Sequence, residues 1–187
     1  MDFQKALNKR ENVKKYTSKK PPIEDVIQAI EAANSIPGPS NLDVISYVLV
    51  QDSKKIAEIA EGCQQNFISG VPYVIVICSN PKQLKKLFDN KAEKYLKHHV
   101  GASADALSLK LNDLGLASCW IETFSDVTIK NLLLIPDYIE IELIISIGYQ
   151  MGKTIQRKKP SLNKKVFFDS WKIIYSKPIQ RIRREDI

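Results

Sequence analysis

Three polar residues near the start of the chain have types and spacing suited to holding an anion: Arg10, Asn12 and Lys14. Arginine presents five N–H donors in a planar fork that matches a phosphate group, and an asparagine amide both donates and accepts hydrogen bonds. Because side chains two residues apart share a face of an extended segment, the three would point to the same side. The ordinary alternatives are a surface ion pair of Arg10 with Glu11 or Asp2, a turn or helix-cap role for Asn12, and plain exposure of Lys14.

A second candidate segment, residues 35–42, combines glycine and proline with an asparagine. Gly38 permits close approach of the backbone to a ligand, Pro37 fixes a turn, and Asn41 adds a side-chain amide. The same composition is typical of any surface turn, which is the alternative interpretation.

Positive charge is concentrated in three clusters. The 187 residues include 28 lysines and arginines against 21 aspartates and glutamates, so the net charge is 28 − 21 = +7. Such clusters favour nucleic acid, an anionic membrane surface or a phosphorylated cofactor. We expect no nucleic-acid partner, because neither a recognition helix nor stacking aromatic residues accompany the charge. The clusters are Lys5, Lys9, Arg10, Lys14, Lys15, Lys19 and Lys20; Lys153, Arg157, Lys158, Lys159, Lys164 and Lys165; and Arg181, Arg183 and Arg184.

The cysteines and histidines lack the spacing of a metal site. Cys63, Cys78 and Cys119 form no close pair, and only His98 and His99 could join them. We therefore expect no metal and no disulfide framework, and we expect Cys78 and Cys119 to be buried thiols.

No stretch of the sequence is long and apolar enough to cross a bilayer. The longest apolar runs, Val71–Cys78 and Ile139–Tyr149, fall well short of the roughly 20 residues that a spanning helix needs. The first residues also lack the apolar core of a secretory signal. These features predict a cytoplasmic protein with no membrane partner.

Hydrophobic periodicity predicts the elements that must position the candidate residues. The spacing of Ile23, Val26, Ile27 and Ile30 is that of an amphipathic helix. We expect a single domain over residues 1–187, of the α+β class, with helices covering a sheet. The predicted helices are Ile23–Ala33, a short one capped by Ser53 and ended by Gly62, Pro81–Leu96, Val100–Leu114 capped by Gly115, and Asp126–Leu134; the predicted strands are Val44–Val50, Val71–Cys78, Leu116–Ile121, Glu140–Gly148 and Lys172–Ser176.

Four segments, in this order along the chain, resemble the motifs of the FMN-dependent nitroreductase family. The family motifs run Arg-Arg-Ser-Val-Arg-x-Tyr/Phe, then Ala-Pro-Ser-x-x-Asn-x-Gln-Pro-Trp, then Gly-Leu-Gly-x-Cys-Trp-Ile-Gly-x-Phe, then a Gly-Tyr-Pro turn with a closing Arg-Lys-Pro. The resemblance implies the nitroreductase fold, with a mostly antiparallel central sheet. The matching segments are Lys9–Tyr16, Ser35–Leu42, Gly115–Phe124, and Ile145–Tyr149 followed by Arg157–Pro160.

The resemblance also implies a role for each candidate residue. The FMN phosphate would be held at one end of the chain by Arg10 and at the other by Arg157 and Lys158, with Lys159 as a substitute. Lys14 would lie near the N1/O2 edge of the flavin, where a cation stabilises the reduced form. The remaining residues that would line the cofactor are Asn12, Pro37, Gly38 and Asn41, together with Ile121 and Glu122 through their backbone amides near N5 and O4.

The chain departs from the family motifs at several positions. Asn12 stands where the family has serine, and Lys14 stands where it has arginine. The Gln-Pro-Trp stretch is Asp43-Val44-Ile45 here. The last change makes the substrate side less typical than the cofactor side.

The implied activity is ping-pong transfer of a hydride from NADH or NADPH through flavin N5 to an electron-poor acceptor such as a nitroaromatic or a quinone. The cofactor carries this chemistry, so no protein nucleophile is expected; a proton relay through Glu122 is less favoured than simple solvation of its carboxylate. The family is homodimeric with FMN at the interface, and residues 165–187 resemble the arm that wraps the partner. The alternatives are a flavin-binding protein of this fold without turnover and a basic nucleic-acid-binding module.

Overall fold

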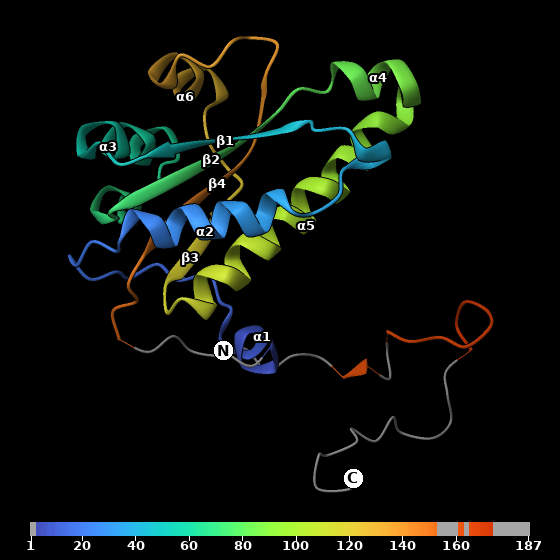
Figure 1. Cartoon of the computed structure of the whole chain (residues 1–187), viewed down its shortest axis with the longest axis horizontal. Helices are drawn as coiled ribbons and strands as arrows, with labels where there is room; N and C mark the ends of the chain where they lie inside the picture. The colour runs from blue at the N-terminus through green and yellow to red at the C-terminus, as the bar shows by residue number, and fades with distance from the viewer. Residues whose placement is uncertain (1–2, 153–160, 163–164, 174–187) are drawn as a thin grey trace, which may run out of the picture. The chain divides into compact units, whose positions relative to one another are not determined.

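The computed structural model describes residues 3–152, 161–162 and 165–173. The chain divides into two compact units, Met1–Thr154 and Ile155–Ile187. The first unit contains the helices and strands labelled in Figure 1. No helix in the described part of the chain combines the length and the apolar character needed to cross a membrane.

Four antiparallel strands form the central sheet in the order β1-β2-β4-β3. Every residue of β2 is buried, as expected for a strand covered on both faces. Alternate residues of β2 face opposite layers: Ile75 and Ile77 contact one core cluster, and Val74 and Val76 contact the other. The strands are β1 (Ile45–Val50), β2 (Tyr73–Ser79), β3 (Ala117–Ile121) and β4 (Glu140–Gly148).

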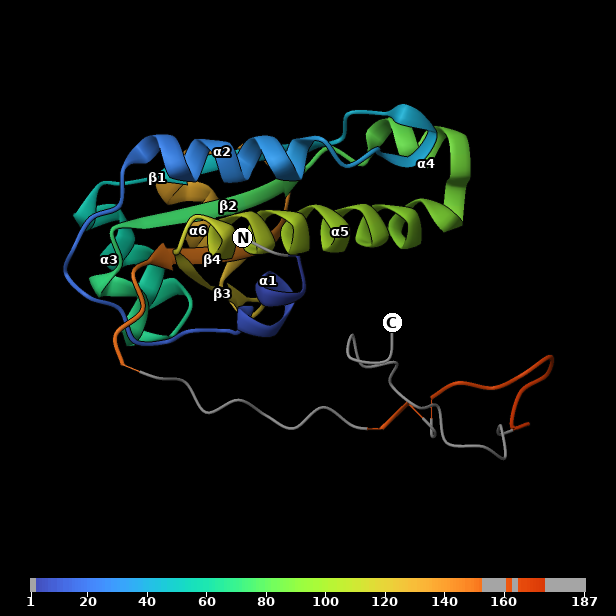
Figure 2. The same cartoon turned by 60° about the horizontal axis from the view of Figure 1, so that its bottom comes forward.

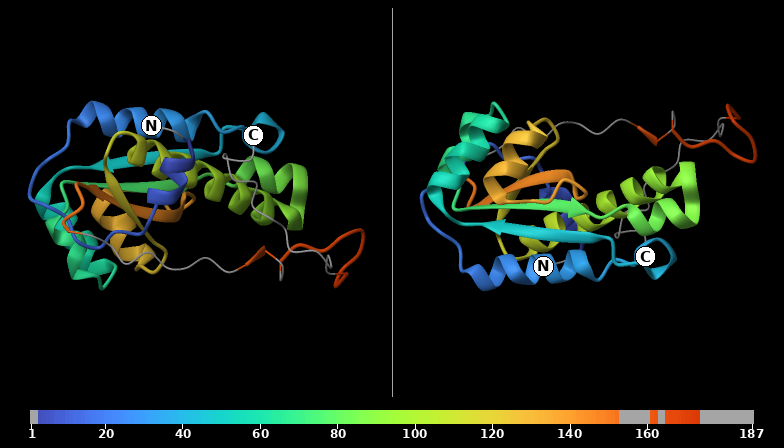
Figure 3. Two further views of the ribbon diagram at one scale, coloured as in Figure 1. Left: turned by 90° about the horizontal axis from the view of Figure 1, so that it is seen from below. Right: turned by 90° about the horizontal axis from the view of Figure 1, so that it is seen from above.

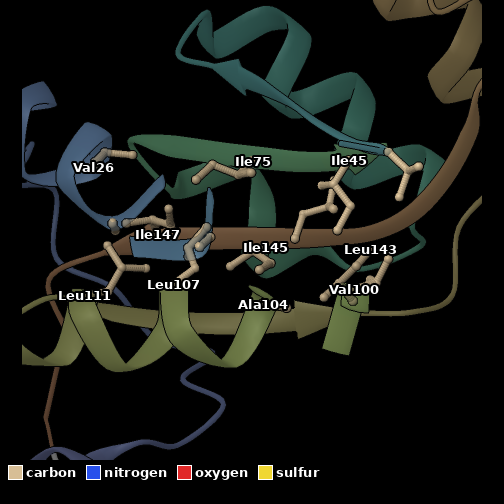
Figure 4. Close-up of a cluster of buried hydrophobic side chains, with 14 of the residues drawn as sticks. Val26, Ile45, Ile75, Val100, Ala104, Leu107, Leu111, Leu143, Ile145 and Ile147 are labelled. Atoms are coloured by element: carbon tan, nitrogen blue, oxygen red, sulfur yellow. The ribbon is translucent and has the colours of Figure 1, made fainter. Parts of the chain in front are cut away.

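Two long helices, α2 (Ile23–Asn34) and α5 (Ala92–Asp113), cover one face of the sheet (Figure 1). Both helices place apolar side chains toward the strands at helical spacing, which is why they pack there. Figure 4 shows these side chains meeting Ile75 of β2 and Leu143, Ile145 and Ile147 of β4. The helix residues labelled there are Val26, Val100, Ala104, Leu107 and Leu111.

The helices α3 (Ser53–Gly62) and α6 (Asp126–Leu133) cover the opposite face (Figures 2 and 3). Their buried residues Ile56, Ile59 and Ile129 join the second core cluster. The sheet therefore lies between two helical layers. This confirms the predicted α+β class, with helices covering an antiparallel sheet.

The predicted elements of this unit are present, with two corrections. The helix expected over Pro81–Leu96 is broken into α4 (Lys82–Phe88), a 3-10 turn (η3, Asp89–Lys91) and the start of α5, because Asp89 adopts φ 46° and ψ −120°. Helix α3 is capped by Asp52 and not by Ser53: the Asp52 carboxylate accepts from the Lys55 amide at 2.9 Å.

Two further helical elements flank the candidate site. A short helix, α1 (Phe3–Lys9), precedes the basic segment and was not predicted, and a 3-10 turn, η1 (Pro39–Asn41), lies within the predicted loop.

The C-terminal expectations are mostly outside the described residues. Of the predicted strand Lys172–Ser176, Lys172 lies in a turn, which contradicts that part of the prediction, and residues 174–176 are outside the described part. Phe167 and Trp171 pack together with ring centroids 4.7 Å apart. The exchanged arm stays a prediction.

Candidate functional site

The basic segment after α1 is extended and lies beside the outer strand β3. A parallel bridge joins Asn12 to Ser118, and the Val13 amide donates to the Ser118 carbonyl at 2.9 Å. Val13 is buried, whereas Lys14 is exposed. This alternation supports the prediction that every second side chain of the segment faces the same side.

Arg10 is positioned by a carboxylate and an aromatic ring. Its Nε lies 3.3 Å from Oδ1 of Asp105 on α5, and its guanidinium carbon lies 5.8 Å from the centroid of the Trp120 ring. Arg10 forms an ion pair with Asp105, whereas in the described part of the chain no ion pair with Glu11 is found, and Asp2 lies outside that part. The pairing atom is Nε, and within the described residues the two terminal nitrogens have no ion-pair partner, so they can donate to a further anion.

Asn12 is fixed by the backbone of β3. Its Oδ1 accepts from the Trp120 amide at 3.3 Å, so Asn12 is neither a helix cap nor a simple turn residue. Trp120 is itself anchored, because its indole Nε1 donates to Ser108 at 2.8 Å and the Ser108 hydroxyl donates to the Ala104 carbonyl at 2.8 Å. The Oδ1 atom of Asn12 is thus used as an acceptor, and its NH2 group is the part of the amide that can donate to a ligand.

Lys14 lies over the ring of Phe67, near the start of the neighbouring 3-10 turn η2 (Asn66–Gly70). Its Nζ is 5.4 Å from the centroid of Phe67, a cation–π contact. The charge of Lys14 also acts on Cys119: burial raises the pKa of that thiol, and Lys14 opposes the rise. The cation therefore lies next to β3, on the same segment as Arg10 and Asn12.

Ile121 and Glu122, the last two residues expected to line the cofactor, lie at the end of β3. Ile121 is buried and pairs with Ile144, whereas Glu122 follows the strand and is exposed. Exposure of Glu122 favours the solvated carboxylate over a proton relay.

The loop over residues 35–42, called the loop group below, lines a cavity of about 280 Å³. Pro37, Gly38 and Asn41 line it together with Asp43, the residue that replaces the family's glutamine. Tyr47 also lines it, and burial raises the pKa of this phenol, with Asp43 adding to the rise. The Asp43 carboxylate on the lining favours a hydrogen-bond donor over an anion in this cavity.

The loop group follows the C-terminal end of α2, whereas the basic segment lies beside β3 (Figures 1 and 2). Among the described residues that line the loop cavity, none belongs to the basic segment. Arg157, Lys158 and Lys159 are outside the described residues.

Several residues that shape the site had not been predicted. Asp105, Ser108 and Phe67 act through contacts that no local motif reveals, because they come from other elements. His99 had been considered only as a metal ligand, and it lines the loop cavity. Among the described residues, no three His, Cys, Asp or Glu side chains gather as a metal site.

The sequence is similar to a known family and to a known protein. Residues 57–149 match the family model described as the nitroreductase family. The chain is 22% identical over 167 residues to iodotyrosine deiodinase from Thermotoga neapolitana, a match that covers 75% of this chain and 84% of that protein.

Solved structures agree over almost the whole chain. An FMN-dependent nitroreductase from Clostridium difficile R20291 superimposes with a TM-score of 0.76 and 25% identity, covering 89% of this chain and 98% of that one. The NADPH:FMN oxidoreductase from Vibrio harveyi, solved with NAD+, gives a TM-score of 0.79 at 17% identity and covers 100% of this chain and 81% of that one.

Proposed function

Because the chain belongs to the nitroreductase family, we propose that it is an FMN-dependent oxidoreductase that oxidises NADH or NADPH and reduces an electron-poor acceptor. The observation that carries the proposal is the extended segment held against β3, with Arg10, Asn12 and Lys14 directed by contacts with the sheet and α5. When bound, FMN supplies the hydride chemistry at N5, and the residues of the chain bind and orient it.

The donor set of the basic segment fits FMN. Arg10 keeps its terminal nitrogens for the phosphate dianion, and Arg157 and Lys158 would add further charge-assisted contacts. The Asn12 NH2 group would donate to the ribityl chain or to the ring. Each of these groups is a donor or a cation, as a polyanionic and hydroxylated cofactor requires.

Two groups would tune the reactivity of the ring. Lys14 would face the N1/O2 edge, where negative charge develops on reduction, and Phe67 limits the positions its ammonium group adopts. Ile121 and Glu122, at the end of β3, would contribute backbone N–H groups near N5 and O4. A main-chain donor at this place is independent of the exposed Glu122 carboxylate.

The separation of the two residue groups supports a homodimer with shared sites. Pro37, Gly38 and Asn41 would contact the flavin that the basic segment of the partner subunit binds. Residues 165–187 would form the arm that packs on the partner. This arrangement would bring together two groups of residues that line different places on one chain.

Steady-state turnover tests the proposal. With FMN-loaded protein, we expect oxidation of NADH or NADPH that depends on menadione, a nitrofuran or iodotyrosine as acceptor. FMN binding without oxidation of either nicotinamide would instead support the flavin-binding protein without turnover. Failure to bind FMN combined with a shift of labelled DNA would support the nucleic-acid module.

A further inference from the structure

The imidazole of His99 joins helix α5 to the loop that carries Pro37 and Gly38. Its Nε2 lies 3.2 Å from the backbone oxygen of Ile36. A carbonyl oxygen only accepts, so Nε2 donates, and in the neutral ring the hydrogen is on Nε2 and the lone pair on Nδ1.

The ring also packs against Gly38. A side-chain carbon added at Gly38 would lie 3.0 Å from Cε1 and 3.3 Å from Nδ1 of His99, and it would overlap the Leu42 carbonyl oxygen. The loop therefore approaches α5 closely only because residue 38 has no side chain. The glycine and the imidazole fit one another at this contact.

The second nitrogen of the ring shows that this histidine is more than core packing. Nδ1 is buried and has no hydrogen-bond partner among the described residues. A buried acceptor without a partner is unfavourable, and an apolar side chain of similar size would avoid that penalty. The bond to Ile36 is the contact that only a donor at Nε2 supplies.

We propose that His99 is a positioning residue that holds the loop of Pro37, Gly38 and Asn41 in the shape that receives the flavin. This inference rests on the proposed function and adds a residue that acts on the flavin through the loop. It acts through the carbonyl of Ile36, next to Pro37. The loop turns sharply beyond that point, with Asn41 at φ 54°, so a fixed start is needed to place the Asn41 amide.

Matched variants at position 99 test the proposal. His99→Gln keeps an N–H donor at nearly the same distance from the backbone. His99→Leu removes the donor, and His99→Asn has a donor on a side chain that is too short to reach Ile36. His98→Leu is the control, because His98 is the exposed neighbour on the same helix. Two quantities are measured: FMN affinity by fluorescence titration, and hydrogen exchange of residues 35–43 by mass spectrometry without FMN.

We expect His99→Leu and His99→Asn to raise the dissociation constant of FMN about threefold to tenfold and to accelerate exchange of residues 35–43. His99→Gln should stay within about twofold of the wild type in both measurements, and His98→Leu should match the wild type. Exchange and affinity unchanged in His99→Leu and His99→Asn would overturn the proposal, and so would equal losses in His99→Gln. If the wild type itself does not bind FMN, the proposed function fails, whereas the exchange comparison still decides whether His99 holds the loop.

Discussion

Arg10 contacts two groups, the Asp105 carboxylate and the Trp120 ring. Its ion pair with Asp105 is partly exposed, with 34% and 44% of the two side chains accessible. Such pairs contribute only about 0–1 kcal/mol, whereas a hydrogen bond to a fully charged group contributes about 1.5–3 kcal/mol. A phosphate dianion would therefore outcompete Asp105, while the Trp120 ring lies 5.8 Å from the guanidinium carbon.

Replacement of Arg10 tests its part in the phosphate site. Arg10→Ala should raise the dissociation constant of FMN about tenfold to a hundredfold, because a charge-assisted contact is lost. Asp105→Asn should leave the affinity unchanged or improve it, since it removes a competitor. Fluorescence titration of both variants measures this, and an Arg10→Ala protein with wild-type affinity would place Arg10 outside the site.

Lys14 should act on the reduction potential more than on binding. Negative charge at the N1/O2 edge exists only in the reduced flavin, so the ammonium group stabilises that state selectively. Lys14→Met keeps much of the apolar stem and removes the charge, and the two-electron potential should fall by roughly 20–45 mV. A dye-coupled redox titration measures it, with Arg10→Ala as control because the phosphate charge is the same in both redox states. Equal potentials in Lys14→Met and the wild type would leave Lys14 as a surface residue.

At the scale of the elements, helix α3 packs against η2, the turn that carries Phe67. The stability of α3 therefore matters to the site. The cap of this helix is Asp52, whose carboxylate accepts from the Lys55 amide. Loss of such a cap typically costs about 1 kcal/mol.

The cap assignment leads to a stability prediction. Asp52→Ala should lower the free energy of unfolding by about 1 kcal/mol, and Ser53→Ala, at the residue that the sequence pattern favours as cap, should change it by a few tenths at most. Chemical denaturation followed by circular dichroism compares the two. A larger effect of Ser53→Ala would show that the sequence interpretation was the better one.

Local patterns predicted the elements well because the hydrophobic pattern of each helix or strand lies within a few adjacent residues. The apolar run of β2 and the periodicity of α2 are examples, and both elements begin within two residues of the predicted start. Two adjacent candidates, Asp52 and Ser53, cannot be separated as caps by type alone, because both side chains accept hydrogen bonds. The break at Asp89 depends on how α4 and α5 pack, which no local pattern contains.

The candidate site was predictable only in part for the same reason. Motif order singled out Arg10, Asn12 and Lys14, and their extended segment was expected from their spacing. The partners that hold them, Asp105 and Phe67, come from distant elements and carry no signal near the motif. The sequence therefore predicts the extended conformation of this segment better than it predicts the side chains that orient its residues.

At the scale of the whole molecule, the proposed homodimer would bring the two residue groups together. The C-terminal stretch exposes large apolar side chains in the single chain, with Trp171 77% and Ile173 56% accessible. Burying a side chain of this size contributes about 1.5–3 kcal/mol, which favours packing on a partner subunit.

Truncation tests that role. Deletion of residues 165–187 should give a monomer, an aggregate or a protein without flavin, as measured by multi-angle light scattering with absorbance detection. Trp171→Ser in the full chain should weaken the dimer in the same direction. A truncated chain that stays a dimer and retains flavin would contradict the arm.

The visible absorption spectrum of the purified chain tests the central claim most directly. After reconstitution with FMN and removal of the excess, we expect the bands of oxidised flavin at about one equivalent per chain, and their loss when NADH or NADPH is added without oxygen. Retention of the flavin bands only in the presence of the Arg10 side chain would tie the spectrum to the proposed site. A protein that is folded by circular dichroism and yet keeps no flavin after reconstitution would contradict the account.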